Sequence, residues 1–190
     1  ERPRRLVVAS SMSIYGEGDY RCAKCDSRIH PFLRPDEQLA AHEWNFRCTE
    51  CGRELELAGT PESKPLYPTS VYAVSKQDQE QYSLAVGRAY KIPTVAFRYF
   101  NVYGTRQALS NPYTGVCAIF SSRLLNDQAP MIFEDGEQSR DFVHVSDIVQ
   151  ANLLALETDK ADYHAINVGT GQATSVKQIA VLLAKGLGKE

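Results

Sequence analysis

The sequence has 190 residues, of which 43% are hydrophobic and 23% are charged, and its formal net charge is −2. That length is enough for one large core, or for one and a half domains. The small net charge gives no electrostatic case for nucleic acid or an anionic membrane as the main partner. No apolar run approaches the ~20 residues of a membrane-spanning helix, so we expect no membrane span.

The chain passes almost at once into an apolar run at residues 6–10. Strands of a parallel sheet are buried on both faces and therefore read as continuously apolar, so this run predicts a central parallel strand. The residues before this run do not resemble a signal peptide. We expect a cytoplasmic protein whose natural start lies upstream of this strand.

Residues 17–66 differ from the rest of the chain. They hold four of the five cysteines, many charges and no sustained periodicity, and they predict an insertion with its own small fold. The four cysteines form two Cys-x-x-Cys knuckles, at Cys22 and Cys25 and at Cys48 and Cys51. Two knuckles supply the four thiolates of a closed, tetrahedral zinc site, which would be structural. Disulfides are disfavoured without a secretory signal; a lost metal is the other alternative.

The pattern becomes helical from Ser70, which is a suitable N-cap, and Pro93 should end the helix. Residues 94–99 are β-branched and aromatic and predict the next strand, so that strand, helix and strand form a βαβ unit. An apolar face recurs along the helix at Val71, Val74, Tyr82, Ala85, Val86 and Ala89.

The second half of the sequence continues to alternate. We expect helices at residues 114–126, 146–157 and 175–187, with strands at residues 131–133 and 165–168.

Tyr72 and Lys76 stand one helical turn apart on the same helix face. A tyrosine is a poor base at neutral pH because its pKa is near 10, and a nearby cation favours the phenolate. Such a pair can remove a hydroxyl proton while a hydride leaves the same carbon. The spacing alone does not prove this chemistry, because two residues on the exposed surface of an ordinary helix are often spaced in the same way.

Polar motifs at predicted strand ends support the chemical interpretation. Ser10 and Ser11 follow the first strand, at the edge where α/β proteins bind ligands. Arg-Tyr-Phe-Asn-Val-Tyr-Gly begins at Arg98, and Arg-Asp-Phe-Val-His-Val begins at Arg140. Asn-Val-Gly-Thr-Gly follows from Asn167.

These motifs, in this order, resemble the extended short-chain dehydrogenases/reductases, and within them the NAD-dependent nucleotide-sugar 4-epimerases. The resemblance covers nearly everything outside residues 17–66. It implies an enzyme with NAD as cofactor, a nucleotide sugar as substrate and a homodimer as the full-length assembly.

The resemblance also implies residue roles. Catalysis would use Ser11, Tyr72 and Lys76. NAD would contact Ser10, Ser11, Tyr72, Lys76, Tyr99 and Phe100. The substrate would contact Asn101, Met131, Phe133 and Arg140, since arginine suits a diphosphate.

The glycine-rich turn that places a pyrophosphate on a helix N-terminus is absent from these residues. We therefore expect a fragment that is inactive in isolation. Its fold would be α/β: residues 1–16 and 67–110 form the C-terminal half of a Rossmann-like, doubly wound parallel sheet. Residues 17–66 are the inserted zinc knuckle, and residues 111–190 are part of a small substrate-binding region.

Two other functions remain open. One is a non-catalytic remnant whose zinc knuckle mediates protein contacts. The other is a 4,6-dehydratase, which needs an added acid and base beside the tyrosine. The dehydratases that this chain also resembles have an Asp-Glu pair after the catalytic hydroxyl, where this sequence has Met12 and Ser13. Neither can protonate a leaving hydroxide, so the sequence favours the epimerase.

Overall fold

The computed structural model describes residues 3–108 and 115–189. The chain divides into two compact units. Unit 1 consists of Glu1–Tyr99 and Leu154–Asn167, and unit 2 consists of Phe100–Leu153 and Val168–Glu190. The predicted boundary between residues 110 and 111 lies outside the described residues. Within the described ranges, no helix combines the length and apolarity that a bilayer crossing requires.

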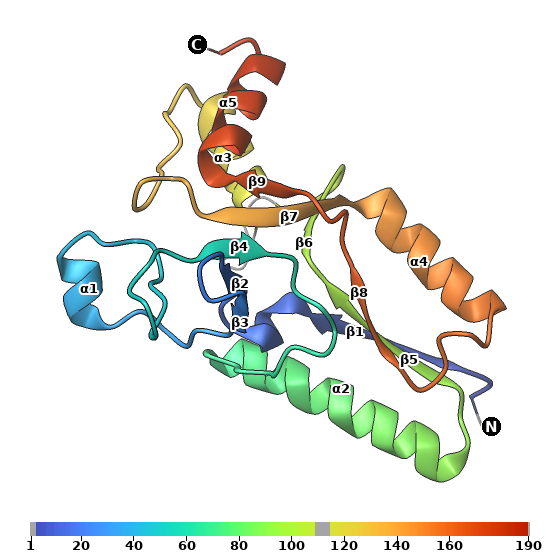
Figure 1. Ribbon diagram of the computed structural model, residues 1–190. Coiled ribbons are helices and arrows are strands. Elements are labelled where there is room, and N and C mark those ends of the chain that lie inside the picture. Colours follow the sequence, from blue (N-terminus) through green and yellow to red (C-terminus); the bar gives the residue numbers. More distant parts are fainter. Residues whose placement is uncertain (1–2, 109–114, 190) are drawn as a thin grey trace. The chain divides into compact units, whose positions relative to one another are not determined.

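Unit 1 is built on a sheet with the strand order β1-β5-β8. Its strands are β1 (Leu6–Ser11), β5 (Thr94–Tyr99) and β8 (Ala165–Val168). β1 and β5 run parallel, with Leu6 opposite Thr94 and Ser11 opposite Tyr99. Between them in sequence lies α2 (Val71–Tyr90), which runs along both strands (Figure 1). The predicted α/β class with a parallel sheet is confirmed.

The ends of α2 follow from local chemistry. The side chain of Ser70 accepts a hydrogen bond from the amide of Ala73 at 3.1 Å, as expected of an N-cap. At the other end, Lys91 takes a left-handed conformation with φ 53°. Near this end a Cβ at Gly87 would collide with the side chain of Thr94. Glycine therefore lets the last turns of α2 approach β5 closely.

The face of α2 that packs on the sheet is not the apolar face seen in the sequence. The buried residues are Ala73, Leu84 and Gly87, together with Glu80. By contrast, Val71 is 88% exposed and Tyr82 is 73% exposed. A helix lying close to a sheet needs small side chains at the contact, and these contribute little to a count of large apolar residues.

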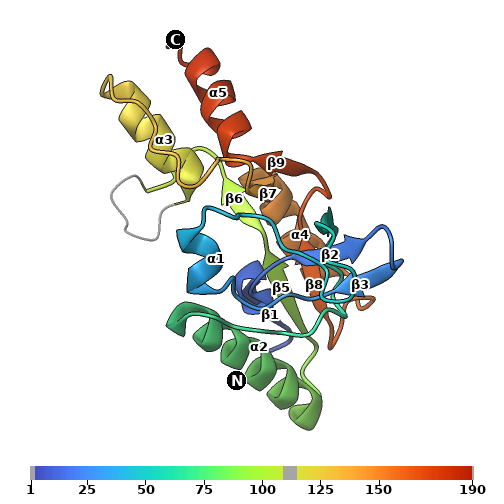
Figure 2. The same ribbon diagram turned by 60° about the vertical axis from the view of Figure 1, so that its left-hand side comes forward.

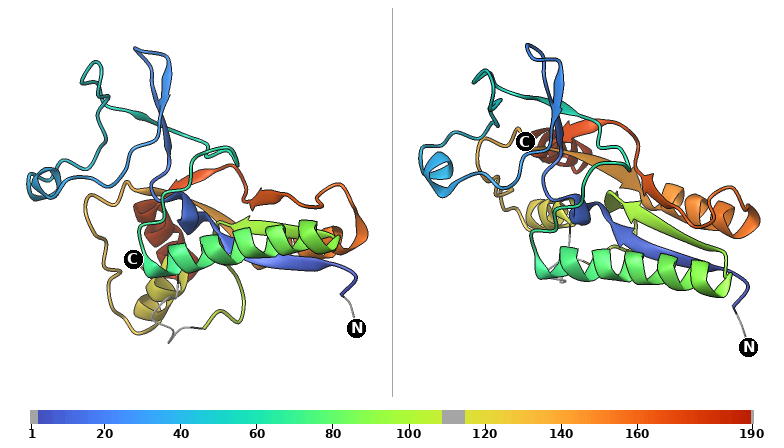
Figure 3. Two further views of the ribbon diagram at one scale, coloured as in Figure 1. Left: turned by 90° about the horizontal axis from the view of Figure 1, so that it is seen from below. Right: turned by 60° about the horizontal axis from the view of Figure 1, so that its bottom comes forward.

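The inserted segment has its own sheet and its own core. An antiparallel sheet of order β3-β2-β4 combines β2 (Asp19–Cys22), β3 (Ser27–Ile29) and β4 (Glu56–Ala58), and α1 (Asp36–Ala40) lies between β3 and β4 in sequence. Cys22, Cys48 and Leu55 form its buried cluster. The segment leaves the carboxyl end of β1 through the 3₁₀ turn η1 (Met12–Tyr15) and returns to the start of α2 (Figures 2 and 3).

Unit 2 has a sheet of order β6-β7-β9. Its strands are β6 (Asn101–Tyr103), β7 (Ser139–His144) and β9 (Ala173–Ser175). β6 pairs with β7 in parallel, and β9 pairs with β7 in antiparallel. Two helices, α3 (Val116–Leu125) and α5 (Val176–Gly186), pack together through Phe120, Val176 and Ala180.

The predicted helices of the second half are observed, as α3, α4 (Val145–Glu157) and α5. The first residue of the helix predicted at 114–126 lies outside the described residues. The strand predicted at residues 131–133 is wrong, because this segment has no strand structure. β7 pairs with β6 over Phe142–His144 and with β9 over Ser139–Asp141, and the apolar run lies in the connection between α3 and β7. A short apolar run forms a strand only where a partner strand pairs with it.

Candidate active site

Ser11 ends β1 and caps the turn that follows. Its hydroxyl accepts a hydrogen bond from the amide of Ser13 at 3.1 Å, and it lies 3.1 Å from the Ser13 hydroxyl. The side chain is therefore held at the carboxyl end of the strand, where ligands bind in α/β proteins.

The side chain of Ser10 contacts α2 instead of the turn after β1. Its hydroxyl donates to Glu80 Oε2 at 2.7 Å, and the residue is buried. The contact joins β1 to α2. A direct contact between the Ser10 side chain and a cofactor stays a prediction.

Tyr72 and Lys76 lie in the first turns of α2. The Lys76 ammonium donates to the Ala9 carbonyl at 2.9 Å and to Gln79 Oε1 at 3.1 Å. It lies 6.0 Å from the centroid of the Tyr72 ring, which is 47% exposed. Lysine therefore ties this turn of the helix to β1, two residues before Ser11, and leaves the phenol accessible.

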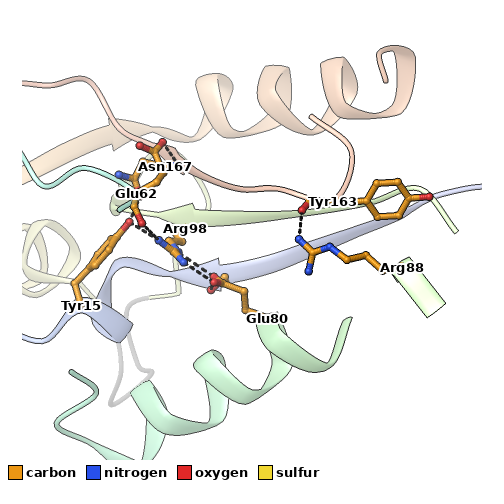
Figure 4. Close-up of polar contacts among 8 residues, drawn as sticks. Tyr15, Glu62, Glu80, Arg88, Arg98, Tyr163 and Asn167 are labelled. Carbon is orange, nitrogen blue, oxygen red and sulfur yellow. Dashed lines mark hydrogen bonds and ion pairs between the residues drawn. The ribbon is translucent and has the colours of Figure 1, made fainter. Parts of the chain in front are cut away.

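A buried polar network lies next to these residues (Figure 4). The carboxylate of Glu80 accepts from Arg98 Nη2 at 2.6 Å and from Nε at 3.0 Å. Arg98 Nη1 donates to the Tyr15 hydroxyl at 2.7 Å and to the Glu62 carbonyl at 3.0 Å. The Tyr15 hydroxyl donates in turn to Asn167 Oδ1 at 2.8 Å. The network joins α2, β5, η1 and β8.

Tyr15 takes part in this network as a protonated phenol. Burial raises the pKa of its phenol, although Arg98 acts in the opposite direction. Burial would lower the pKa of Arg98, but its hydrogen bonds to Glu80 and Tyr15 raise it overall. Tyr15 is therefore a neutral hydrogen-bond donor, which leaves the half-exposed Tyr72 as the candidate base. Sequence reasoning missed this network, although Arg98 and Asn167 both stand inside the quoted motifs.

The next three predicted residues, Tyr99, Phe100 and Asn101, are consecutive, and Tyr99 is the last residue of β5. The Tyr99 ring stacks on Phe97, with centroids 6.1 Å apart. In unit 2, the amide of Phe100 donates to the Val168 carbonyl at 3.2 Å, and Asn101 Nδ2 donates to the Asp141 carbonyl at 3.2 Å. The Phe100 amide and the Asn101 side chain thus hold this stretch at the start of β6.

The remaining predicted substrate residues also belong to unit 2. Met131 and Phe133 are exposed, and Phe133 is 69% exposed. Arg140, on β7, is exposed, and its Nη1 donates to the Ser139 carbonyl at 2.8 Å. All three side chains are therefore accessible to a ligand.

The Gly169–Gly171 loop is occupied by a side chain of the same unit. The Asp141 carboxylate accepts from the Thr170 amide at 2.9 Å, from the Thr170 hydroxyl at 2.8 Å and from the Gly171 amide at 2.7 Å. A Cβ at Gly169 would lie 2.7 Å from Asp141 Oδ2. These amides already bind a carboxylate, so the loop is no substitute for a pyrophosphate-binding turn.

The four cysteines of the insertion converge. Their Sγ atoms all lie within 4.8 Å of one another, with Cys22 and Cys51 at 3.5 Å and Cys25 and Cys48 at 3.9 Å. Zn–S bonds of ~2.3 Å in a tetrahedron require S···S separations of roughly 3.8 Å. All four are free thiols. Gly52, with φ +70°, makes the tight turn after the last of them.

The thiols respond differently to this crowding. The amide of Cys25 lowers the pKa of the Cys22 thiol to about 7, whereas the Cys51 side chain raises the pKa of the Cys25 thiol. Four thiolates cannot form together at this spacing unless a cation balances their charge. The donor set and its geometry therefore fit zinc.

The parallel sheet, the Tyr72 and Lys76 helix and the serine at the strand end together define a Rossmann-like protein of the short-chain dehydrogenase/reductase class. The sequence model described as "NAD dependent epimerase/dehydratase family" matches residues 49–169, more than half of the chain. The chain belongs to this family, as the motifs predicted.

Three similar proteins illustrate the relationship. dTDP-L-rhamnose 4-epimerase of Burkholderia thailandensis is 34% identical over 96% of this chain and 49% of its own length. UDP-glucose 4-epimerase of Thermotoga maritima, solved with UDP-glucose, has a TM-score of 0.72 at 32% identity, over 98% of this chain and 48% of that one.

UDP-glucuronic acid 4-epimerase of Bacillus cereus, solved with UDP-glucuronic acid and NAD, has a TM-score of 0.72 at 25% identity, over 100% of this chain and 48% of that one. The chain thus spans about half the length of the relatives described here.

Proposed function

We propose that the whole protein containing these residues catalyses NAD-dependent epimerisation at C4 of a nucleotide-linked sugar. The proposal concerns the whole protein because the chain spans about half of its relatives' length. The observation that carries the proposal is the hydrogen bond that the Lys76 ammonium donates to the Ala9 carbonyl. This contact holds the turn of the accessible Tyr72 beside the strand that ends at Ser11.

In the proposed reaction, Tyr72 is the base that takes the O4 proton. Lys76 favours the phenolate through its positive charge, and Ser11 hydrogen-bonds the same oxygen and helps to move the proton. NAD held beside Tyr72 and Lys76 would supply a hydride acceptor for C4 and would give the same hydride back to the other face of the 4-keto sugar. Tyr72 would then return its proton to O4. The sugar leaves as its C4 epimer, with no net oxidation.

The residues proposed to hold NAD fit that role in part. Lys76 and the accessible Tyr72 offer polar groups suited to a ribose, and Tyr99 and Phe100 offer aromatic surface. For the substrate, we propose that Arg140 and Asn101 bind the diphosphate and that Met131 and Phe133 contact the nucleotide base. Arginine suits phosphate because its planar donors bind two oxygens at once.

The test of this function is an isotope experiment. The full-length protein should interconvert C4 epimers of a nucleotide-linked hexose without losing water. In deuterated water the product should gain no deuterium at C5, because Met12 and Ser13 supply neither the acid nor the base of an elimination. The amide of Ser13 is also engaged as a donor to the Ser11 hydroxyl. Mass spectrometry and NMR of the product measure both outcomes.

The opposite result identifies the second candidate. A 4-keto-6-deoxy product that carries solvent deuterium at C5 would establish a 4,6-dehydratase. Full-length protein that binds NAD and converts no nucleotide sugar would instead favour the non-catalytic alternative.

We also propose that the insertion is a structural zinc knuckle. Purified protein should carry about one zinc per chain, bound by the four converging thiolates. Cys48→Ser should lose most of the metal and unfold the insertion while α2 stays folded, because α2 packs on β1 and β5 rather than on the cysteines. Metal analysis and hydrogen exchange measure the two effects.

The matched control is Cys117→Ser, which removes the cysteine outside the cluster. Its zinc content should equal that of the unmodified protein. Less than half an equivalent of zinc in zinc-replete, unmodified protein would contradict the proposed site.

Two further proposals concern the assembly and the compartment. The exposed apolar face of α2, which includes Val71, Tyr82 and Tyr90, supports a homodimer of the full-length enzyme. Sedimentation equilibrium tests this, and a monomer at micromolar concentration would contradict it.

The free thiols support a reducing compartment, and hence the cytoplasm. Fractionation that finds the protein outside the cytoplasm would refute that placement.

A further inference from the structure

A buried lysine lies at the junction between the insertion and the turn that follows β1. Lys64 is 2% exposed. Its ammonium donates to the Tyr15 carbonyl at 2.9 Å and to the Pro65 carbonyl at 3.4 Å. It also lies 5.2 Å from the centroid of the Tyr67 ring and 5.9 Å from that of Tyr15. Burying an ammonium group is costly unless such contacts compensate for lost water.

The main acceptor, the Tyr15 carbonyl, belongs to the last residue of η1. Carbonyl groups at the end of a helical turn lack partners within it, and they attract cations. The other end of the same turn is capped by the Ser11 hydroxyl. The turn is thus held at one end by the proposed catalytic serine and at the other end by Lys64.

The segment that carries Lys64 packs directly on this turn. Gly16 follows η1 with φ +69°, and a Cβ at this position would collide with the carbonyl oxygen of Tyr67. Only glycine allows so close an approach without strain. The segment therefore follows the backbone of the turn closely, and a shift in one requires a shift in the other.

The insertion also holds a buried carboxylate. Asp19, the first residue of β2, is fully buried and forms an ion pair with Arg28, and its Oδ1 lies 3.2 Å from His30 Nε2. Burial lowers the pKa of Lys64, while the negative charge of Asp19 acts in the opposite direction. β2 ends at Cys22, one of the four clustered thiols. A continuous strand therefore connects the cysteine cluster to the surroundings of Lys64.

We propose that Lys64 is a positioning residue of the enzyme: it fixes the Tyr15 carbonyl and thereby orients the turn on which Ser11 presents its hydroxyl. The insertion takes part in this function because Lys64 lies within residues 17–66 and donates to the Tyr15 carbonyl. The proposal rests on the proposed epimerase function, in which Ser11 contacts the reacting oxygen. Lys64 itself touches neither substrate nor cofactor in that reaction.

The test compares Lys64→Met with the unmodified full-length protein. Methionine keeps the apolar stem and removes the ammonium. Turnover (kcat) should fall about 10- to 100-fold, since a small displacement of a reacting group has an effect of this size. KM for the nucleotide sugar and for NAD should change less than about twofold, because the binding groups lie elsewhere. Zinc content and circular dichroism should not change. Lys160→Met, at an exposed lysine, is the matched control and should retain full turnover.

A second measurement does not depend on activity. In Lys64→Met, hydrogen exchange should be faster at the amides of Ser13 and Gly16, which form hydrogen bonds within the turn. Exchange in α2 and β5 should not change. If the unmodified protein shows no epimerisation, the proposed function fails, and the exchange result still reports whether Lys64 holds the turn.

Three results would overturn the proposal. They are wild-type turnover in folded Lys64→Met, unchanged exchange in the turn, and loss of turnover that is matched by loss of zinc or of folded protein. Where Lys64→Met does not fold, Lys64→Gln, which keeps an N–H donor, replaces it. A reduction in turnover of at least about threefold is then expected, and wild-type turnover would overturn the proposal.

Discussion

Replacing Tyr72 with phenylalanine is expected to lower the turnover of the full-length protein by about 10² to 10⁴-fold, the usual contribution of a positioned acid or base. The ring remains, so packing should not change. The lost hydroxyl is the group proposed to take the O4 proton. Because the ring is half exposed, no buried partner is left unsatisfied, and the melting temperature should be unaffected. Steady-state epimerisation and single-turnover NAD reduction measure the effect.

The control for this variant is Tyr82→Phe. Tyr82 lies on the same helix and is 73% exposed, so the substitution makes the same chemical change away from β1. It should retain wild-type turnover. Equal losses in the two variants, or wild-type turnover in Tyr72→Phe, would show that Tyr72 is not the base.

The second large effect concerns stability. Glu80→Gln should lower the free energy of unfolding by about 3–5 kcal/mol, the usual cost of removing one partner of a buried ion pair. The glutamine amide offers one acceptor oxygen where the carboxylate has two, and its NH₂ group would face the donors of Arg98. Ser10 and Arg98 both donate to Glu80, so the variant disturbs β1 and β5 together. Denaturant unfolding followed by circular dichroism measures the change.

Glu157→Gln is the matched control, because it makes the same replacement at an exposed helix end. Its stability should stay within about 0.5 kcal/mol of the unmodified protein. A change below about 1 kcal/mol in Glu80→Gln would mean that the buried pair contributes little, as hydrophobic replacements of other buried pairs have shown.

The sequence was most informative where local chemistry decides the structure. The Ser70 cap, the boundary before Pro93 and the strand Thr94–Tyr99 were all predicted and are all observed. Capping, proline geometry and β-branching act over a few residues, so they can be read without knowing the fold. The two Cys-x-x-Cys knuckles likewise indicated which thiols converge, because each knuckle brings its own two sulfurs together.

The sequence was less informative about which side of an element faces the protein. The apolar face predicted for α2, which includes Val71 and Tyr82, faces outward, whereas its buried residues are Ala73, Leu84 and Gly87 together with Glu80. Residues 131–133 form no strand, because a short apolar run becomes a strand only where a partner strand pairs with it. Both outcomes depend on elements that are distant in sequence, and periodicity contains no information about them.

Only the tertiary structure decided the long-range polar contacts. Glu80, Arg98, Tyr15 and Asn167 come from four segments, and Lys64 meets Tyr15 across 49 positions of sequence. Their spacing carries no periodicity and no short motif that links them. The sequence by itself determined the family, the parallel βαβ unit and the convergence of the cysteines, because local motifs and backbone geometry specify them. The partner of a buried polar residue depends on burial and on charge pairing, and both arise only once the chain has folded.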